Sequence, residues 1–304
     1  MAGPSPRPGQ KTVLITGCTP GGIGHAMAQE FHSKGLYVIA TARRIDVLAG
    51  VADQGMAAVA LDVTSKESIA ACKKTVADLT GGRLDILVNN AGRTMTVPAT
   101  DLDMDEVRGT FELNVFGVMA MCQAFAPLLI AARGLVVNVA SISAVAPYVF
   151  GAAYCASKGA VVAYSRCLRQ ELRPFGVRVT VVMAGTVRSN IVSAGLRTLP
   201  ADSLYQPVAE LYARRQVYSQ TIRTMDTAEF ARQVANGVLA PEAPLAVLRG
   251  WLGLWRPDWL YCGGMARIVY LGTLLGEWMV DRGAWRTFGL QKLKNLWDQK
   301  QKAA

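Results

Sequence analysis

Histidine is scarce in this sequence. Only His25 and His32 occur in 304 residues, and both fall in one predicted helix beside a glycine-rich turn. Neither is well placed as the base of a serine hydrolase, and two histidines with scattered cysteines form a poor donor set for a metalloenzyme. The sequence therefore disfavours both of these classes, and we expect no metal site.

Paired cysteines and a targeting segment are also missing. The six cysteines include no Cys-x-x-Cys pair, so we expect neither a disulfide framework nor a metal cluster, and the pattern is typical of a reducing compartment. Residues 1–10 are rich in Pro and Gly and lack the apolar core of a signal peptide. We expect them to form a disordered lead.

Two long stretches lack charge altogether, residues 113–132 and 134–157. Either is long enough to cross a membrane. The first, however, carries Asn114, Gln123 and Pro127, and the second contains a short apolar run followed by a proline loop. We therefore predict buried strands and interface helices in both stretches, and no spanning helix.

Acidic residues are too few to balance the basic ones, which gives a net charge of +10. Half of that excess falls in residues 282–304, where six basic residues face one acidic residue. Such a tail is commonly a solvated end, and its functional alternatives are nucleic acid, anionic lipid or an anionic substrate. Nucleic acid is disfavoured because no recognisable module carries the interleaved aromatic residues it would need.

What the sequence does contain is a regular alternation of apolar strands and helices. The hydrophobic content of 51% is enough for one large core. Short apolar runs alternate with helical patterns, which predicts an α/β protein with a Rossmann-type, doubly wound parallel sheet. The predicted strands are 11–16, 37–41, 57–61, 84–88, 135–137 and 177–182, and the clearest predicted helices are 23–33, 65–79 and 154–172.

A glycine-rich turn joins the first strand to the first helix. It reads TGCTPGGIG from Thr16 to Gly24. In this position the helix N-terminus and bare backbone amides accept a pyrophosphate, so Gly17, Gly22, Ile23 and Gly24 are predicted to bind a dinucleotide. Whether Gly21 or Gly22 serves as the middle glycine stays open.

The end of the second strand indicates which dinucleotide is bound. Proteins that prefer NAD carry an acidic residue there to bind the ribose hydroxyls. This chain has Arg43 and Arg44 instead, and no acid until Asp46. Guanidinium groups suit a 2′-phosphate, so we predict NADPH or NADP as the cofactor. The alternative is a loop that is merely basic.

Tyr154 and Lys158 carry the chemistry. Four residues apart on a helix, they share one face. We expect the ammonium to lower the phenol pKa by on the order of two units from its usual ~10, which would suit a general acid near neutral pH. Ser141 lies thirteen residues before Tyr154, at a strand end, where its hydroxyl could bond the carbonyl that Tyr154 protonates. Ser143 competes, at eleven residues before Tyr154, and we favour Ser141.

These residues, the glycine turn, Asn114 and the run Asn89–Gly92 together resemble the short-chain dehydrogenase/reductase family. The resemblance implies a catalytic tetrad of Asn114, Ser141, Tyr154 and Lys158. It implies that Asn114 anchors a water of the proton relay and that Lys158 also holds the nicotinamide ribose. The resemblance further suggests a homo-oligomer, either a dimer or a tetramer.

The same resemblance implies further cofactor contacts. Asp62 would flank the adenine ring, Asn90 would lie on the cofactor side of its turn, and Val187 and Ser189 would contact the nicotinamide end. Around these last two the chain departs from the family pattern, because Ala184 stands where a proline is usual and Ser189 where a threonine is usual.

We expect one catalytic domain over residues 11–243, with a substrate lid near 193–221, and a hydrophobic, basic extension over 244–304. All six tryptophans fall in that extension, and its first three, at positions 251, 255 and 259, repeat every four residues, which predicts one helical face if Pro257 does not break the helix. With a basic tail this suits a peripheral attachment to a membrane or lipid-droplet surface. The alternative is a hydrophobic lid packed on its own domain or on a second subunit.

Over nearly its full length the chain is similar to the fungal NADPH-dependent 1-acyldihydroxyacetone-phosphate reductases, in residues 111–117, 151–158, 173–178, 199–205 and around Trp251. This resemblance implies reduction of a lipid-like ketone, with or without a phosphate, at the cytoplasmic face of the endoplasmic reticulum or a lipid droplet, with the cytosol as the alternative location. The alternative functions are a ketoreductase of fungal secondary metabolism, a hydroxysteroid-type dehydrogenase and a non-catalytic NADP-binding scaffold.

Overall fold

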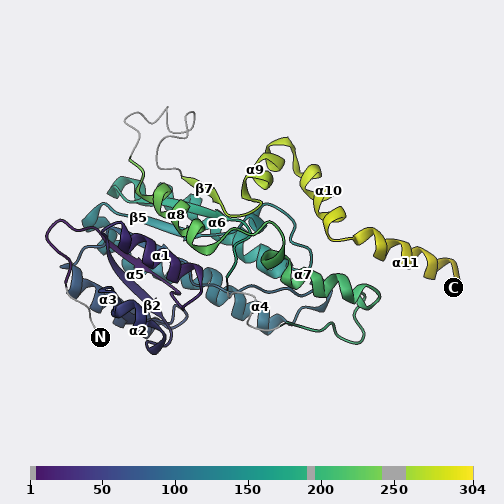
Figure 1. The fold of residues 1–304 in the computed structure, drawn as a ribbon, viewed down its shortest axis with the longest axis horizontal. Helices are drawn as coiled ribbons and strands as arrows, with labels where there is room; N and C mark the ends of the chain where they lie inside the picture. Colours follow the sequence, from purple (N-terminus) through teal and green to yellow (C-terminus); the bar gives the residue numbers. More distant parts are fainter. Residues whose placement is uncertain (1–4, 190–195, 242–257, 304) are drawn as a thin grey trace.

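A computed structural model describes residues 5–189, 196–241 and 258–303 and centres on one parallel β-sheet (Figure 1). The strand order is β3-β2-β1-β4-β5-β6-β7, and every neighbouring pair is parallel. This order is that of a doubly wound sheet, so the predicted fold class is confirmed. The strands are β1 (Thr12–Ile15), β2 (Tyr37–Ala42), β3 (Ala57–Ala60), β4 (Ile86–Asn89), β5 (Leu135–Val139), β6 (Arg178–Ala184) and β7 (Trp259–Cys262).

Helices cover both faces of the sheet, which explains why its strands are nearly continuous apolar runs. On one face α1 (Ile23–Ser33) and α8 (Thr227–Leu239) share a core cluster with β1 and β2. On the other face α3 (Lys66–Thr80), α5 (Gly117–Ala132) and α6 (Ala152–Leu172) share a second cluster. The remaining helices of the catalytic part are α2 (Ala49–Ala52), α4 (Met104–Phe111) and α7 (Ala209–Thr221).

The helices predicted from local signals lie where expected. Helix α1 has the predicted bounds. The N-cap of α3 is Ser65, whose hydroxyl accepts a hydrogen bond from the Ser68 amide at 3.1 Å. A capping hydroxyl satisfies one of the amide groups that a helix start leaves unpaired.

The two uncharged stretches form parts of this fold. Residues 104–132 are long and apolar enough to cross a membrane by length and composition alone. In the structure they form α4, a π-helical turn and α5, and α5 buries Met121, Phe125 and Leu129 in the second core cluster. Residues 134–157 contain β5 and the start of α6. Burial against the sheet accounts for the apolar character of both stretches.

The C-terminal region differs from the expectation. Trp259 begins β7, which pairs with β6, so the prediction that it continues a helical face is wrong. Trp251 and Trp255 lie outside the described residues. The run from Trp259 to Cys262 is apolar and aromatic, which suits a strand beside a buried neighbour. The sheet therefore continues past residue 243, into the segment expected as an extension.

Three helices follow β7: α9 (Ala266–Leu275), α10 (Glu277–Thr287) and α11 (Leu290–Ala303). In Figure 1 α9 rises beside β7, and α10 and α11, in yellow, lead away from the sheet to the C-terminus. Helix α9 contacts β7 and α10. The chain thus returns to the carboxyl end of the sheet before it ends.

Candidate active site

The carboxyl ends of the central strands surround a cavity of about 550 Å³. In a doubly wound sheet this edge is the usual ligand site, because the strand order reverses there. The cavity brings together predicted residues that are far apart in the sequence. Those that line it are Ile23, Asn90, Ser141, Tyr154, Lys158, Val187 and Ser189.

The glycine turn at the end of β1 is shaped for close backbone approach. A Cβ atom on Gly24 would lie 2.3 Å from the Gly17 carbonyl oxygen and 2.5 Å from Asn90 Nδ2. Gly17 and Gly21 both have positive φ angles, +74° and +75°, which glycine adopts without strain. Gly21 therefore takes the left-handed position of the turn, and Gly22 is the N-cap residue of α1.

The start of α1 fits a pyrophosphate. Within the described residues no side chain caps this helix, and its first turn holds no acidic residue. Its first amide groups therefore stay open to an anion, and the helix dipole favours one. Asn90 holds the turn in place. Its side-chain Nδ2 donates to the Thr16 carbonyl at 2.8 Å, and its backbone N–H donates to the Thr16 hydroxyl at 2.9 Å.

Arg43 and Arg44 directly follow β2, and Asp62 lies just after the neighbouring strand β3. Both arginines are exposed, and Arg44 forms an ion pair with Asp46 at 3.2 Å. Hydrogen bonds from Thr64 lower the pKa of Asp62, and the charge of Arg43 adds to that shift. Arg43 thus acts electrostatically on the residue that was predicted to flank the adenine ring.

Tyr154 and Lys158 lie one turn apart on α6, and their environment differs from the expectation. Lys158 Nζ donates a hydrogen bond to the Val139 carbonyl at 2.9 Å and lies 5.9 Å from the centroid of the Tyr154 ring. Burial raises the pKa of the Tyr154 phenol, and a hydrogen bond with Ser141 opposes that rise. The expectation that Lys158 lowers the pKa of this phenol below its usual value is therefore wrong for this structure, because desolvation dominates.

Ser141 and Ser143 both line the cavity, but their hydroxyls have different partners. Ser141 forms the N-cap of a short 3-10 turn and accepts a hydrogen bond from the Ser143 amide at 3.1 Å. Ser141 also hydrogen-bonds Tyr154. The buried Ser143 hydroxyl has no hydrogen-bond partner among the described residues. The structure thus places Ser141, rather than Ser143, in contact with the phenol.

Asn114 supports the site from behind. It lies in the π-helical turn Glu112–Phe116, a kind of irregularity found frequently at functional sites. Its Nδ2 donates to the Arg93 carbonyl at 2.9 Å and to the Ser157 hydroxyl at 3.1 Å, and its Oδ1 accepts from the Arg93 amide at 2.9 Å. A Cβ atom on Gly92 would lie 3.1 Å from Asn114 Oδ1 and 3.7 Å from Lys158 Nζ. Gly92 therefore lies close to both side chains, and a larger residue there would crowd Asn114.

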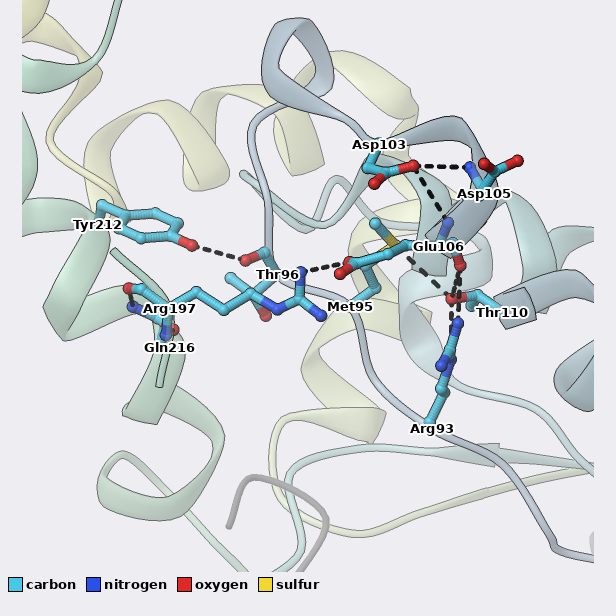
Figure 2. A network of polar contacts seen from close by, with 10 residues as sticks. All are labelled: Arg93, Met95, Thr96, Asp103, Asp105, Glu106, Thr110, Arg197, Tyr212 and Gln216. Carbon is cyan, nitrogen blue, oxygen red and sulfur yellow. Dashed lines mark hydrogen bonds and ion pairs between the residues drawn. The ribbon is translucent and has the colours of Figure 1, made fainter. Parts of the chain in front are cut away.

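The predicted lid is tied to α4 by the network in Figure 2. Tyr212 on α7 donates to the Thr96 carbonyl at 2.9 Å, and Arg197 forms an ion pair with Glu106 on α4. Arg93 donates to the Glu106 carbonyl at 2.7 Å. Because the backbone of Arg93 also holds Asn114, the lid and the catalytic side share one set of contacts.

The residues of the far wall of the cavity were not identified from the sequence, which offered a hydrophobic lid for this region only as the alternative to membrane attachment. This wall includes apolar side chains from α9, from α10 and from the turn after α10, with Arg215 and Tyr218 from α7. The apolar members include Ile268, Val269, Leu271, Leu275, Met279, Val280 and Phe288. The apolar run in α9 was visible in the sequence, but nothing local indicated that it would cover this site.

Comparison with known proteins agrees with this geometry. The short chain dehydrogenase family model matches residues 11–198, and the chain belongs to this family of oxidoreductases. A solved short-chain dehydrogenase from Streptomyces avermitilis is similar in fold, with 28% identity, a TM-score of 0.74 and coverage of 93% of this chain and 98% of the other.

Two fungal relatives are similar over most of their length. An NADPH-dependent 1-acyldihydroxyacetone phosphate reductase of Schizosaccharomyces pombe is 38% identical over 276 residues, 88% of this chain and 90% of the relative. A short-chain dehydrogenase of Neurospora crassa is 37% identical over 290 residues, 95% of each chain. A solved metagenomic short-chain oxidoreductase in complex with NADP is 36% identical, with a TM-score of 0.53 and coverage of 59% of this chain and 83% of the other.

The cofactor is NADP(H), and the residues present fit it. The uncapped start of α1 and the cradle around Gly24 suit the pyrophosphate, and the exposed guanidinium groups of Arg43 and Arg44 suit a ribose phosphate. From the turn, the cavity lining continues through Asn90 and Lys158 to Tyr154. Ile23, the first residue of α1, lines the same cavity, so the helix start beside the glycine turn and the phenol border one cavity.

Proposed function

We propose that the protein reduces a ketone to a secondary alcohol, with NADPH supplying the hydride when bound. The observation that carries this proposal is the shared cavity, in which Ser141, Tyr154 and Lys158 meet an apolar wall. A ketone carbonyl bound against Ser141 and Tyr154 would have its hydrocarbon part among α9 and α10.

In this proposal Tyr154 donates the proton that the developing alkoxide needs. Burial raises the pKa of the phenol, so the hydroxyl keeps its proton at neutral pH, as a donor must before reduction. Ser141 hydrogen-bonds the carbonyl oxygen and stabilises its growing negative charge. Lys158 holds the nicotinamide ribose, and Asn114 anchors the water that resupplies the proton.

For the substrate we propose 1-acyldihydroxyacetone phosphate, which would be converted to 1-acylglycerol 3-phosphate. The name of the S. pombe relative supports this choice, and so does the apolar wall, which suits an acyl chain. The alternative is another apolar ketone, as for a ketoreductase of fungal secondary metabolism or a hydroxysteroid-type dehydrogenase. The N. crassa relative, named only as a short-chain dehydrogenase, is almost as similar, and one fold serves many substrates.

The test is NADPH consumption with 1-acyldihydroxyacetone phosphate against a panel of neutral ketones and sterols. We expect the phosphorylated lipid to give the highest kcat/KM, and Tyr154→Phe to lower kcat by about 100- to 10,000-fold without weakening NADPH binding. Preference for a neutral ketone would support the alternative substrate. NADPH binding without turnover of any ketone would instead indicate a scaffold.

We also propose that α9–α11 attach the protein to the cytoplasmic face of the endoplasmic reticulum or to a lipid droplet. Several large apolar side chains there are exposed, including Leu271, Leu274, Leu275, Trp278 and Trp297. Leu271 and Leu275 also line the cavity. The cavity wall therefore continues into the exposed apolar surface, which would let a lipid enter without crossing water.

A further inference from the structure

Arg215 on α7 is a buried cation whose charge has little compensation. Its side chain is only 2% exposed. Nε donates to the Val149 carbonyl at 3.0 Å, but within the described part of the chain Nη1 and Nη2 have no hydrogen-bond partner. Leaving such donors unpaired in a buried position is costly, so an anion that pairs with them would be bound strongly.

Aromatic rings enclose this guanidinium. Its Cζ lies 3.1 Å from the centroid of the Tyr148 ring, 4.4 Å from Phe288 and 5.4 Å from Tyr218. Ring faces attract a cation, but they do not replace hydrogen-bond acceptors in the plane of the guanidinium. The rings therefore fix the orientation of Arg215 and leave its terminal donors unused.

Among the described residues, the groups that act on Arg215 electrostatically include no carboxylate. They are Tyr148, Cys155 and Tyr218, and burial raises the pKa of the Cys155 thiol. Burial lowers the pKa of Arg215 to about 10, so the side chain stays charged under physiological conditions. Among these neighbours nothing neutralises the charge, which leaves that role to a bound molecule.

The position of Arg215 points to the substrate as that molecule. Arg215, Tyr148 and Tyr154 all line the cavity. Tyr148 neighbours both of the others, with its ring centroid 6.0 Å from that of Tyr154 and 3.1 Å from Arg215 Cζ. A molecule with an anionic group a few bonds from its ketone could therefore reach Arg215 and Tyr154 together.

We propose that Arg215 binds an anionic group of the substrate, a phosphate or a carboxylate, while Ser141 and Tyr154 hold the carbonyl. The inference rests on the proposed reductase function and narrows its substrates to anionic ketones. The planar guanidinium has two terminal nitrogens free, which matches the oxygen pairs of both anions. Tyr148 and Phe288 position the group by stacking.

The test compares Arg215→Gln with the matched control Arg214→Gln, which alters an exposed arginine on the same helix. The substrates are 1-acyldihydroxyacetone phosphate, an apolar β-keto acid and a neutral ketone of similar size, all at saturating NADPH so that the ribose-phosphate site is filled. For whichever of the two anionic substrates Arg215 binds, we expect Arg215→Gln to lower kcat/KM by about 10- to 100-fold, mainly by raising KM. For the neutral ketone, kcat/KM should change less than about two-fold, and Arg214→Gln should change neither value.

The two anions distinguish the sources of the charge. Loss for the phosphate ester identifies a phosphate site, and loss for the keto acid identifies a carboxylate site. A keto acid preference would contradict the proposed lipid substrate and still support the role of Arg215. Arg215→Lys, which keeps the charge and loses the fork, should restore part of the lost activity. Equal losses for charged and neutral ketones, or no loss at all, would overturn the inference.

Discussion

Tyr154 and Lys158 show how far burial governs single residues in this site. Each is an ionisable group on one helix, and in each case desolvation is the largest influence on the pKa. The proximity of the two side chains could be predicted from their spacing of four residues. The direction in which the pKa of the phenol shifts could not be predicted. That direction depends on the Val139 carbonyl, which holds the ammonium, and on the cavity walls, and neither is visible in a local pattern.

The pH dependence of stability follows from Lys158. Burial lowers the pKa of its ammonium from 10.5 to about 8. Below pH 8 the side chain is charged in both states, and the folded protein bears the full cost of burying that charge. Between pH 8 and pH 10.5 the Lys158 side chain has lost its proton in the folded protein and keeps it in the unfolded chain. Over this range Lys158 therefore makes the free energy of unfolding rise with pH.

We therefore expect the cofactor-free variant Lys158→Met to gain stability relative to the wild type below pH 8. The advantage should shrink as the pH rises through 10.5, by on the order of 3 kcal/mol in total. Urea unfolding of both proteins at several pH values measures this difference. Other buried groups, such as the cysteines, titrate in both proteins and cancel in the comparison. A difference that is independent of pH would contradict the assigned shift.

Cofactor preference is also a property of single residues. Arg44 is paired with Asp46, and Arg43 acts on Asp62. We expect Arg43→Gln to lower the ratio of kcat/KM for NADPH to kcat/KM for NADH by about 10- to 100-fold, because a charge-assisted contact to the ribose phosphate is lost. Arg44→Gln serves as the comparison and should have the smaller effect. An unchanged ratio in both variants would mean that neither arginine reads the phosphate.

At the scale of elements, the glycine turn depends on the missing Cβ of Gly24. Any side chain there would overlap the Gly17 carbonyl and the Asn90 side-chain amide, which are hydrogen-bonded to each other where the turn meets the end of β4. We expect Gly24→Ala to lower stability by about 1–3 kcal/mol and to weaken NADPH binding, because the turn must open to admit a methyl group. Thermal unfolding and NADPH fluorescence measure these two effects.

A control for this substitution lies in the middle of α6. Nothing lies within 4 Å of a Cβ atom placed on Gly159. Since alanine favours a helix interior over glycine, Gly159→Ala should be more stable than the wild type by roughly 0.5–1 kcal/mol. If both variants behaved alike, the clash at Gly24 would not be the cause of its effect.

The elements that could be predicted are those whose signals are local. The strands up to β6 are apolar runs between turns, and α3 begins at a serine cap. Strand β7 lacked such a signal. It is only four residues long, and the spacing of the tryptophans at every fourth position favoured a helix instead. Its conformation is decided by pairing with β6, a partner more than seventy residues earlier in the chain.

At the scale of the whole molecule, the cavity joins parts of the chain that no local pattern connects. The guanidinium of Arg215, on α7, lies against the rings of Tyr148 and Phe288. Tyr148 comes from the loop before α6, and Phe288 comes from the turn after α10. The predicted tetrad lies close together because the sheet topology brings strand ends to one edge. The substrate wall needed the tertiary path of α9 and α10, which the sequence left open between a lid and a membrane anchor.

The path of β7 also determines how membrane attachment should be tested. A truncation that began at Trp251 would remove β7 from the sheet, so loss of binding could reflect unfolding. Leu274 and Trp278 are better targets. They are 64% and 66% exposed, and neither is among the side chains that line the cavity.

We expect the double variant Leu274→Ser and Trp278→Ser to bind vesicles at least about ten-fold more weakly, because burying each side chain in the lipid interface contributes on the order of 1.5–3 kcal/mol. Flotation with phosphatidylcholine vesicles that contain phosphatidylserine measures binding, and activity on a water-soluble ketone should stay unchanged. Phe175→Ser, which alters another exposed apolar residue, is the matched control.

Vesicles without phosphatidylserine should bind the wild type less, because α11 carries four lysines against Asp298. If flotation were unchanged and the double variant instead altered the oligomeric state, this surface would be a subunit interface, and the membrane proposal would be wrong.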